Sequence, residues 1–247
     1  MKKNPQQFNR QEFKYLITLK QKEQLSFQFS QVGLKPDPYS VDMKDNSYPV
    51  TSLYLDTLDF EAYWEKQYGL INRVKFRLRT YDLIRKKHSL VFFEIKQKYN
   101  DFIKKTRFSL KENQAQKFLH HQLTYHQLAS LVFDQQSLAR FYLNFQKLNL
   151  NPVILISYLR QPWLDSFYPN FRLTFDYQIN ATPARDLFSS SPKTQVLPNK
   201  IIMEIKLNGL LPEYLARIIK SHNLSRQSLS KYCLGLETCD IVSQENL

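Results

Sequence analysis

The stretch Asn72–Asp82, NRVKFRLRTYD, alternates basic and apolar residues without interruption. Its basic residues share one parity: Arg73, Lys75, Arg77 and Arg79. In a β-strand, alternate side chains point to the same face, so these four cations would project together. Like charges in one row repel each other, which an ordinary solvated face avoids by mixing signs. We therefore predict that this face binds an anion, and a plain solvated strand face is the alternative.

The same alternation of charged and apolar residues recurs in seven further stretches, which predicts eight antiparallel strands. These stretches are 10–17, 50–57, 89–98, 104–110, 152–160, 171–179 and 201–209. Helical patterns are predicted over 20–32, 59–67, 212–222 and, in two or three pieces, 111–148. Prolines and serines favour loops over 35–49 and 182–200. The chain shows no internal repeat, so we predict one domain over 1–240 and a C-terminal tail over 241–247.

A large antiparallel sheet is expected to close on itself, because an open sheet leaves unpaired edges. With helices packed outside, the charged faces of the strands would point inward. The predicted interior then contains these basic residues: Arg10, Lys14, Arg73, Lys75, Arg77, Arg79, Lys96, Lys98, Lys105, Arg107, Arg160, Arg172 and Lys206. Its acidic residues are Glu12, Asp56, Glu94, Asp176 and Glu204. Because the acids offset only part of the positive charge, we predict a polyanionic ligand.

The composition narrows the class of ligand. The formal net charge of +13 and the isoelectric point near 9.6 also favour a polyanionic partner. With only four glycines, the chain has neither the Rossmann nor the Walker phosphate-binding motif. Nucleic acid is not expected, because base stacking favours aromatic residues beside the cations, and here the two kinds take opposite parities. No apolar run is long enough to span a bilayer, so we expect a cytoplasmic protein with reduced cysteines.

Nine pieces of the sequence, taken in order, resemble a known family. They are RQEFKY, SLYLDT, KFRLRTYD, FEIKQK, KKTRFSL, the strand ending in Arg160, FRLTFD, MEIKLNG and LSKYC. Together they resemble the VTC (vacuolar transporter chaperone) domain, the polyphosphate polymerase branch of the triphosphate tunnel metalloenzyme (CYTH-like) superfamily. The resemblance implies an α+β fold in which an eight-stranded antiparallel closed β-barrel forms a tunnel, with helices packed outside.

The resemblance also implies roles for individual residues. The phosphate-binding catalytic set would be Lys14, Arg77, Arg79, Lys96, Arg160, Arg172, Lys206 and Lys231, the last from the final helical segment. Further substrate contacts would come from Arg10, Arg73, Lys75, Lys98, Lys105 and Arg107. Parity does not choose between Lys105 and Arg107 for the fifth strand, and Arg73 and Lys75 would guide a chain near one mouth. Glu204 would hold Mn²⁺ or Mg²⁺, with Glu12, Glu94 and Asp176 as helpers.

The activity that the resemblance implies is ATP-dependent polyphosphate synthesis inside the tunnel. Hydrolytic members begin with ExExK, whereas RQEFK places Arg10 at the first acidic position, which favours the polymerase branch. A triphosphatase that hydrolyses triphosphate or NTP and a non-catalytic polyphosphate or inositol-phosphate binding module are the alternatives. The expected partners are ATP, inorganic polyphosphate or triphosphate, and a separate membrane protein that would hold the domain at the inner face of a membrane.

Overall fold

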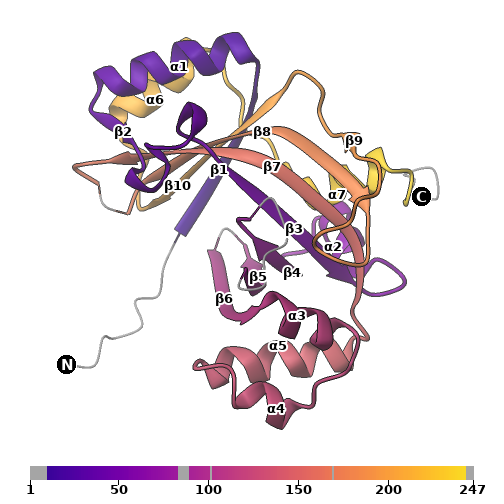
Figure 1. Cartoon of the computed structure of the whole chain (residues 1–247). Helices are drawn as coiled ribbons and strands as arrows, with labels where there is room; N and C mark the ends of the chain where they lie inside the picture. Colours follow the sequence, from indigo (N-terminus) through magenta and orange to yellow (C-terminus); the bar gives the residue numbers. More distant parts are fainter. Residues whose placement is uncertain (1–9, 83–88, 101, 169, 243–247) are drawn as a thin grey trace.

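The computed structural model describes residues 10–82, 89–100, 102–168 and 170–242, and Figure 1 shows their arrangement. The strands within these ranges are β1 Arg10–Ile17, β2 Leu34–Pro36, β3 Tyr48–Asp56, β4 Asn72–Thr80, β5 Leu90–Tyr99, β6 Phe102–Lys111, β7 Asn151–Asp165, β8 Arg172–Pro183, β9 Thr194–Gln195 and β10 Ile201–Asn208. The helices are α1 Leu19–Gln31, α2 Glu61–Gln67, α3 Glu112–Leu119, α4 Tyr125–Ala129, α5 Gln135–Lys147, α6 Glu213–Ser221 and α7 Lys231–Thr238. Two short 3₁₀ turns, η1 Pro38–Ser40 and η2 Lys44–Asn46, precede β3.

The ten strands form one antiparallel sheet, and this sheet does not close into a barrel. Its main order is β1-β10-β8-β7-β3-β4-β5-β6, with β2 beside β7 and β9 beside β8. Over the described ranges, β1 and β6 are therefore the two free ends of the order. The closed barrel expected from the sequence is wrong, whereas the α+β class and the antiparallel pairing are correct.

The outer edge of β1 is covered in part by a segment that is not a strand. The backbone N–H of Gln227 donates to the carbonyl oxygen of Lys14 at 2.8 Å. The Lys14 ammonium also donates to the carbonyl oxygen of Leu229 at 2.8 Å. A segment just before α7 thus satisfies an edge group of β1 that a closing strand would need. Closure was expected because edges need covering, and here a non-strand segment provides part of that cover.

The helices cover the sheet in three groups, visible in Figure 1. Helices α1 and α6 lie together at one end, where Leu25, Phe29 and Leu215 join a core with β1, β8 and β10. Helices α3, α4 and α5 cover β4, β5 and β6 through a second core. Phe93 of β5 stacks on Phe108 with ring centroids 4.8 Å apart and meets Phe141 of α5 at 5.3 Å. The outer, apolar parity of these strands is therefore buried under helices, as the sequence pattern predicts.

The third group, α2 and α7, packs with β3, β7 and β8. Ile154 and Ile156 share the parity of Arg160 along β7, and both contact the core that contains Tyr232 and Leu236 of α7. Helix α7 therefore packs on the same face of β7 that carries Arg160. It fills one end of the curled sheet, which leaves the other end for a ligand.

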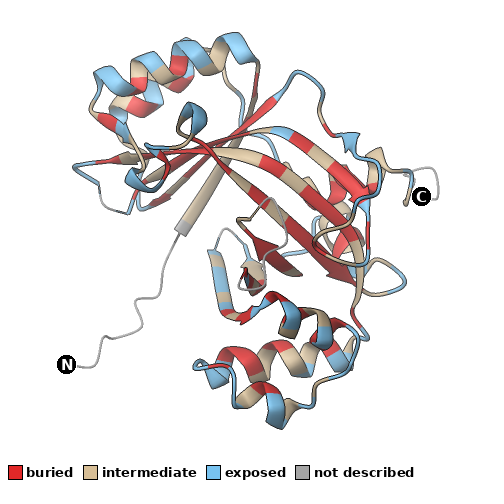
Figure 2. Ribbon diagram, in the orientation of Figure 1, coloured by how far each residue is buried: buried red, intermediate tan, exposed pale blue. Residues whose placement is uncertain are grey.

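The elements form largely where the sequence predicts them. Thr18 caps α1 by accepting from the backbone N–H of Gln21 at 3.2 Å, and the Gln21 side chain accepts from the Thr18 N–H at 2.9 Å. Figure 2 shows buried and exposed residues alternating along α1 and α5, and long buried stretches along β3 and β8. The short strand β9 and the last two residues of β2 fall in segments predicted as loops. Among the described residues, no helix is long and apolar enough to cross a membrane.

Candidate phosphate-binding site on the inner face of the sheet

The sheet curls, so that side chains from strands near its two ends meet across its inner face. The Lys96 ammonium of β5 donates to both oxygens of Glu12 of β1, at 2.9 and 3.1 Å. The Lys14 ammonium lies 3.0 Å from Glu12 Oε1. Burial and Glu204 act to raise the pKa of Glu12, but Lys96, Lys14 and Lys206 lower it to about 2. Lysines from β1 and β5 therefore share the single carboxylate of Glu12.

Glu94, on β5, is the centre of a second charged cluster on the inner face. Its side chain is fully buried, and its two oxygens lie near four cations: Arg77 at 2.8 Å, Arg79 at 3.9 Å, Lys105 at 2.5 Å and Arg107 at 3.7 Å. Burial acts to raise the pKa of this carboxyl, but Arg77, Arg79 and Lys105 hold it well below its usual range. A single anion facing four cations leaves most of their charge for a ligand.

Arg160 and Lys231 form the third cluster, with Asp176 and Glu204. Arg160 binds Asp176 through two parallel hydrogen bonds of 2.6 and 2.7 Å, and its Nη2 lies 3.4 Å from Glu204. The Lys231 ammonium lies 2.6 Å from Asp176 Oδ2. Burial acts to raise the pKa of Asp176, but Arg160 and Lys231 lower it to about 2. These contacts place the first residue of α7 beside the inner-face arginines.

The remaining residues of the predicted catalytic set lie on β10 and β8. Lys206 lies 2.9 Å from Glu204 Oε1, and burial lowers the pKa of this lysine to about 8 despite the attraction of Glu204. Arg172 lies farther along β8, toward the end away from α7. Its Nη2 donates to Asp37 Oδ2 at 2.9 Å and lies 3.5 Å from the Tyr48 hydroxyl. Seven of the eight predicted catalytic residues therefore lie on one face of the sheet, and Lys231 of α7 reaches the same face through Asp176.

Side-chain exposure shows from which side this face is reached. Arg79 and Arg160 are largely buried, with 6% and 12% of their side chains exposed. Lys105, Arg107 and Arg172 are 39%, 36% and 37% exposed. Lys105, Arg107 and Arg172 thus lie at the solvent side of the inner face, and Arg79 and Arg160 lie deeper. An anion can therefore enter past the exposed group and reach Arg79 and Arg160.

The predicted chain-guiding residues lie near the end that α7 fills. The Lys75 ammonium donates to Ser230 Oγ at 3.0 Å and to Cys233 Sγ at 3.4 Å, and burial lowers its pKa. A chain that left past Lys75 would have to displace α7. Arg73 faces Lys98 across the β4–β5 ladder, and both are half-buried. Arg10 begins β1 opposite Asn208, and its side chain lies outside the described part of the structure.

A glycine allows α7 to pack this deeply. A Cβ at Gly235 would clash with Ile156 Cδ1 and lie 3.2 Å from Ile154 Cδ1 and 3.3 Å from Ala181 Cβ. Gly235→Ala should therefore destabilise the protein by about 1–3 kcal/mol through overpacking, although alanine is the better helix former. It should also weaken triphosphate binding, because Lys231 is one turn away. Urea denaturation and calorimetric binding measure the two effects, and a more stable variant would contradict this packing.

A comparison with known families shows which family this chain belongs to. A family model described as the VTC domain matches residues 9–239, almost the whole chain. The chain belongs to the VTC domain family. The match confirms the resemblance drawn from the nine sequence pieces. None of the curated proteins compared with the chain matches it.

Three solved structures are similar to this VTC domain at low identity. A candidate adenylate cyclase from Bacillus halodurans aligns with a TM-score of 0.48 and 14% identity, over 90% of this chain and 95% of its own. A protein from Pyrococcus horikoshii OT3 aligns at 0.46 and 11%, over 94% and 99%. A candidate adenylyl cyclase from Hippeastrum, described as having a dominant triphosphatase activity, aligns at 0.46 and 11%, over 91% and 93%.

The carboxylates of this VTC domain divide into a pair and two others. Glu12 and Glu204 lie on neighbouring strands at adjacent inward positions, close enough that Glu204 acts to raise the pKa of Glu12. Asp176 is near Glu204, whereas Glu94 belongs to the separate arginine cluster. Within the described ranges, no three His, Cys, Asp or Glu residues are grouped to hold a metal ion by themselves. The pair nevertheless fits Mg²⁺, which typically binds one or two carboxylates together with substrate phosphates.

Three tyrosines were missed as site residues by the sequence pattern, although they share the inner face. The Tyr54 hydroxyl accepts from Arg77 Nη1 at 3.1 Å, and Tyr158 accepts from Arg79 Nη2 at 3.3 Å. Burial acts to raise the pKa of Tyr54, but Arg77 and Arg79 lower it to about 8. Together with Tyr48, they show that the assumed separation of aromatics and cations on opposite parities is wrong. Only the ladder pairing of Tyr54 with Arg77 and of Tyr48 with Arg160 would have indicated this role for those two tyrosines.

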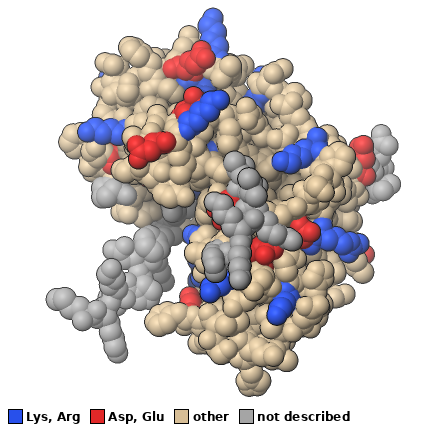
Figure 3. Space-filling model, viewed as in Figure 1, with Lys and Arg blue, Asp and Glu red and all other residues tan. Residues whose placement is uncertain are grey.

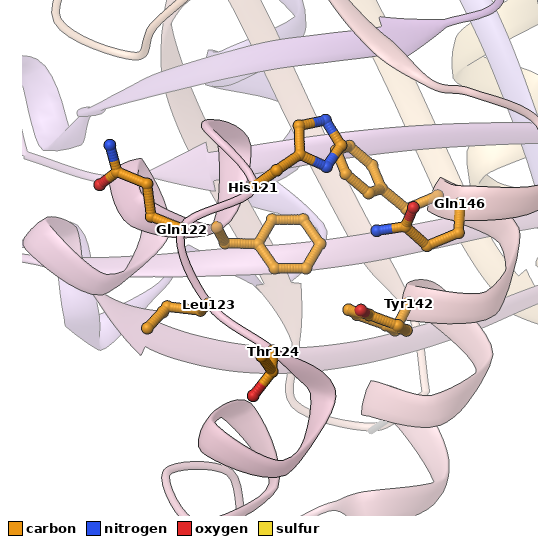
Figure 4. Close-up of a pocket in the computed structure, with 8 residues that line it drawn as sticks. His121, Gln122, Leu123, Thr124, Tyr142 and Gln146 are labelled. Atoms are coloured by element: carbon orange, nitrogen blue, oxygen red, sulfur yellow. The ribbon is translucent and has the colours of Figure 1, made fainter.

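The outer surface offers no rival site of comparable charge on the face shown. Figure 3 shows Lys and Arg scattered among Asp and Glu there. A cavity of about 190 Å³ opens between α3 and α5, and Figure 4 shows its aromatic and neutral lining around His121, Tyr142 and Gln146. This cavity lies in the helical layer outside the sheet. The inner face remains the part of the domain that concentrates cations.

Proposed function

We propose that this protein is an ATP-dependent polyphosphate polymerase that transfers the γ-phosphate of ATP to a growing polyphosphate chain. The observation that supports it most is the sharing of buried carboxylates on the inner face. Glu12, Glu94, Asp176 and Glu204 each contact at least two cations. Cations in such excess favour a bound polyanion, and membership of the VTC family favours a phosphoryl-transfer enzyme.

The geometry suits phosphoryl transfer, in which catalysis is mostly positioning and charge stabilisation. Arg77, Arg79 and Arg160 present planar guanidinium groups that bind phosphate oxygens in pairs, while Lys14 and Lys231 act as point charges. An oxygen of the terminal phosphate of the chain would attack the γ-phosphorus. The bond between that phosphorus and the β–γ bridging oxygen would break, and ADP would leave with the electron pair.

A divalent ion, Mn²⁺ or Mg²⁺, would be held by Glu204 and Glu12, with Asp176 orienting Arg160 beside them. When bound, such an ion neutralises charge on phosphate oxygens. In the structure, Lys14 and Lys96 contact Glu12, and Lys206 contacts Glu204. These lysines can turn toward a phosphate, because their side chains are 20–29% exposed. The lysines and the metal would then share the charge of one ligand.

Product analysis tests this function against its alternatives. Purified protein is incubated with ATP and Mn²⁺, and ADP, free phosphate and long-chain polyphosphate are measured together. ADP with polyphosphate supports the polymerase. ADP with free phosphate identifies a triphosphatase, and polyphosphate binding without turnover identifies a binding module. A separate membrane protein that receives the chain belongs to the same proposal, and co-purification from membranes tests it.

Lys105 gives the site a dependence on pH. Although 39% of its side chain is exposed, its ammonium lies 2.5 Å from the buried Glu94, where desolvation lowers its pKa from 10.5 to about 7; Arg77 acts in the same direction, and Glu94 opposes them. The ammonium is therefore lost as pH rises through about 7, and the protonated form binds phosphate better. We expect the affinity for tripolyphosphate to fall across this range, and Lys105→Arg to flatten the fall because arginine stays charged. Calorimetry between about pH 6 and 9 measures this, and an unchanged slope in the variant would contradict it.

A further inference from the structure

Four aromatic rings form a row at the end of the curl opposite α7. Tyr39 of η1 meets Tyr48 of β3 with ring centroids 5.3 Å apart, and Tyr48 meets Tyr81, just after β4, at 5.8 Å. Tyr81 meets Phe92 of β5 at 5.7 Å. The interplanar angles along the row are 81°, 69° and 62°, so every contact is edge-to-face. No two neighbours in this row stack on each other's faces.

This aromatic row lies directly beyond the buried arginines. Tyr48 is the ladder partner of Arg160, and Phe92 is the ladder partner of Arg79. Tyr81 is two residues beyond Arg79, a distance of about 7 Å along an extended chain. A triphosphate bound to Arg79 and Arg160 would therefore have its remaining substituent beside these rings.

Cations and solvent both border the row. The Arg107 guanidinium lies 3.5 Å from the Phe92 ring centroid, and Arg172 lies 3.5 Å from the Tyr48 hydroxyl. Exposure rises from 6% at Tyr48 to 60% at Tyr39. The N-cap contact between Asp37 and the Tyr39 N–H at 3.0 Å, with the Arg172–Asp37 ion pair, fixes the backbone of the turn that carries the exposed ring. Packing alone does not account for an exposed, tethered ring at the entrance to a phosphate site.

We propose that this row binds the base of the nucleotide donor, with Tyr39 and Tyr81 both in contact with the base, while the triphosphate extends inward to Arg79 and Arg160. The inference rests on the proposed function, because it takes a nucleoside triphosphate as the donor. Stacking on tyrosine is tolerant of base identity, since every base has a π-face. The site should therefore bind ATP and GTP with similar affinity.

Calorimetry with two probes separates the base from the phosphates. The β,γ-imido analogue of ATP and inorganic tripolyphosphate are titrated with Mg²⁺ into the wild type, Tyr39→Ala and Tyr81→Ala. We expect each variant to bind the nucleotide roughly tenfold more weakly and tripolyphosphate as well as the wild type does. Tyr39→Trp should restore nucleotide affinity. Tyr99→Ala is the matched control, because Tyr99 is also 60% exposed but lies at the other end of the sheet.

The outcomes that overturn the proposal are distinct. An equal loss of both ligands in Tyr39→Ala would make the ring a support for the phosphate site, and unchanged nucleotide binding in both alanine variants would remove the base site. If polyphosphate synthesis from ATP persisted in either case, only this inference would fail. If the wild type bound tripolyphosphate but not the nucleotide, the donor assigned under the proposed function would fail with it.

Discussion

Arg77→Ala should lower the turnover of ATP by roughly 10³-fold, the scale on which single arginines act in phosphoryl transfer. Arg77 reaches Glu94 Oε2 at 2.8 Å and the Tyr54 hydroxyl at 3.1 Å, and its side chain is 14% exposed. Its loss should leave the fold intact, because Arg79, Lys105 and Arg107 still surround Glu94. The effect should therefore be on the ligand, with little change in the free energy of unfolding.

Steady-state kinetics and thermal denaturation together measure that effect. Arg77→Lys keeps the charge but loses the planar fork, so its activity should lie between those of the wild type and Arg77→Ala. Arg217→Ala is a matched control, because Arg217 pairs with Glu213 on α6 and its side chain is 78% exposed. Activity in Arg77→Ala equal to that of the control would contradict the role of the inner face.

Glu204→Gln should reduce metal-dependent turnover by at least about 100-fold. The substitution keeps the shape of the side chain but removes the charge that the metal needs. It also removes one partner of Lys206, at 2.9 Å, and of Arg160, at 3.4 Å. Asp176 still binds Arg160 through two hydrogen bonds, so the inner face should keep its structure.

A titration of activity with Mn²⁺ distinguishes a metal ligand from a general disturbance of charge. In Glu204→Gln the midpoint of this titration should move to higher Mn²⁺ concentration. Glu94→Gln is the comparison, because Glu94 lies in the arginine cluster and not in the pair with Glu12. It should impair turnover without moving the midpoint. An unmoved midpoint in Glu204→Gln would refute the metal assignment.

The positions of the strands, and which of their residues point to the inner face, could be predicted from the sequence. This is because each long strand buries its other face under helices. In β4, the parity of Arg73, Lys75, Arg77 and Arg79 is the inner one, and Phe76 and Leu78 enter the core under α5. The two-residue period of the sequence distinguishes the basic inner face of the strand from its apolar outer face. Lys105 and Arg107 share that parity and both contact Glu94, which is why parity could not choose between them.

Closure of the sheet could not be predicted, because it depends on one edge rather than on any pattern within a strand. The contact of Gln227 with Lys14 joins residues more than two hundred positions apart. The position of α7 depends on similar long-range packing around Gly235. Lys231 could be assigned only by family resemblance, because its own segment has no period that points to Asp176. The inner-face tyrosines were missed because an aromatic residue on a strand is usually part of the core.

The fate of the γ-phosphate tests the central claim most directly. ATP labelled in the γ-phosphate is incubated with the protein and Mn²⁺, and the label in polyphosphate is compared with the ADP formed. Transfer to a growing chain predicts that the label in polyphosphate matches the ADP and that Arg77→Ala loses both. Release of the label as free phosphate, with ADP but no polyphosphate, would contradict the polymerase and identify water as the acceptor.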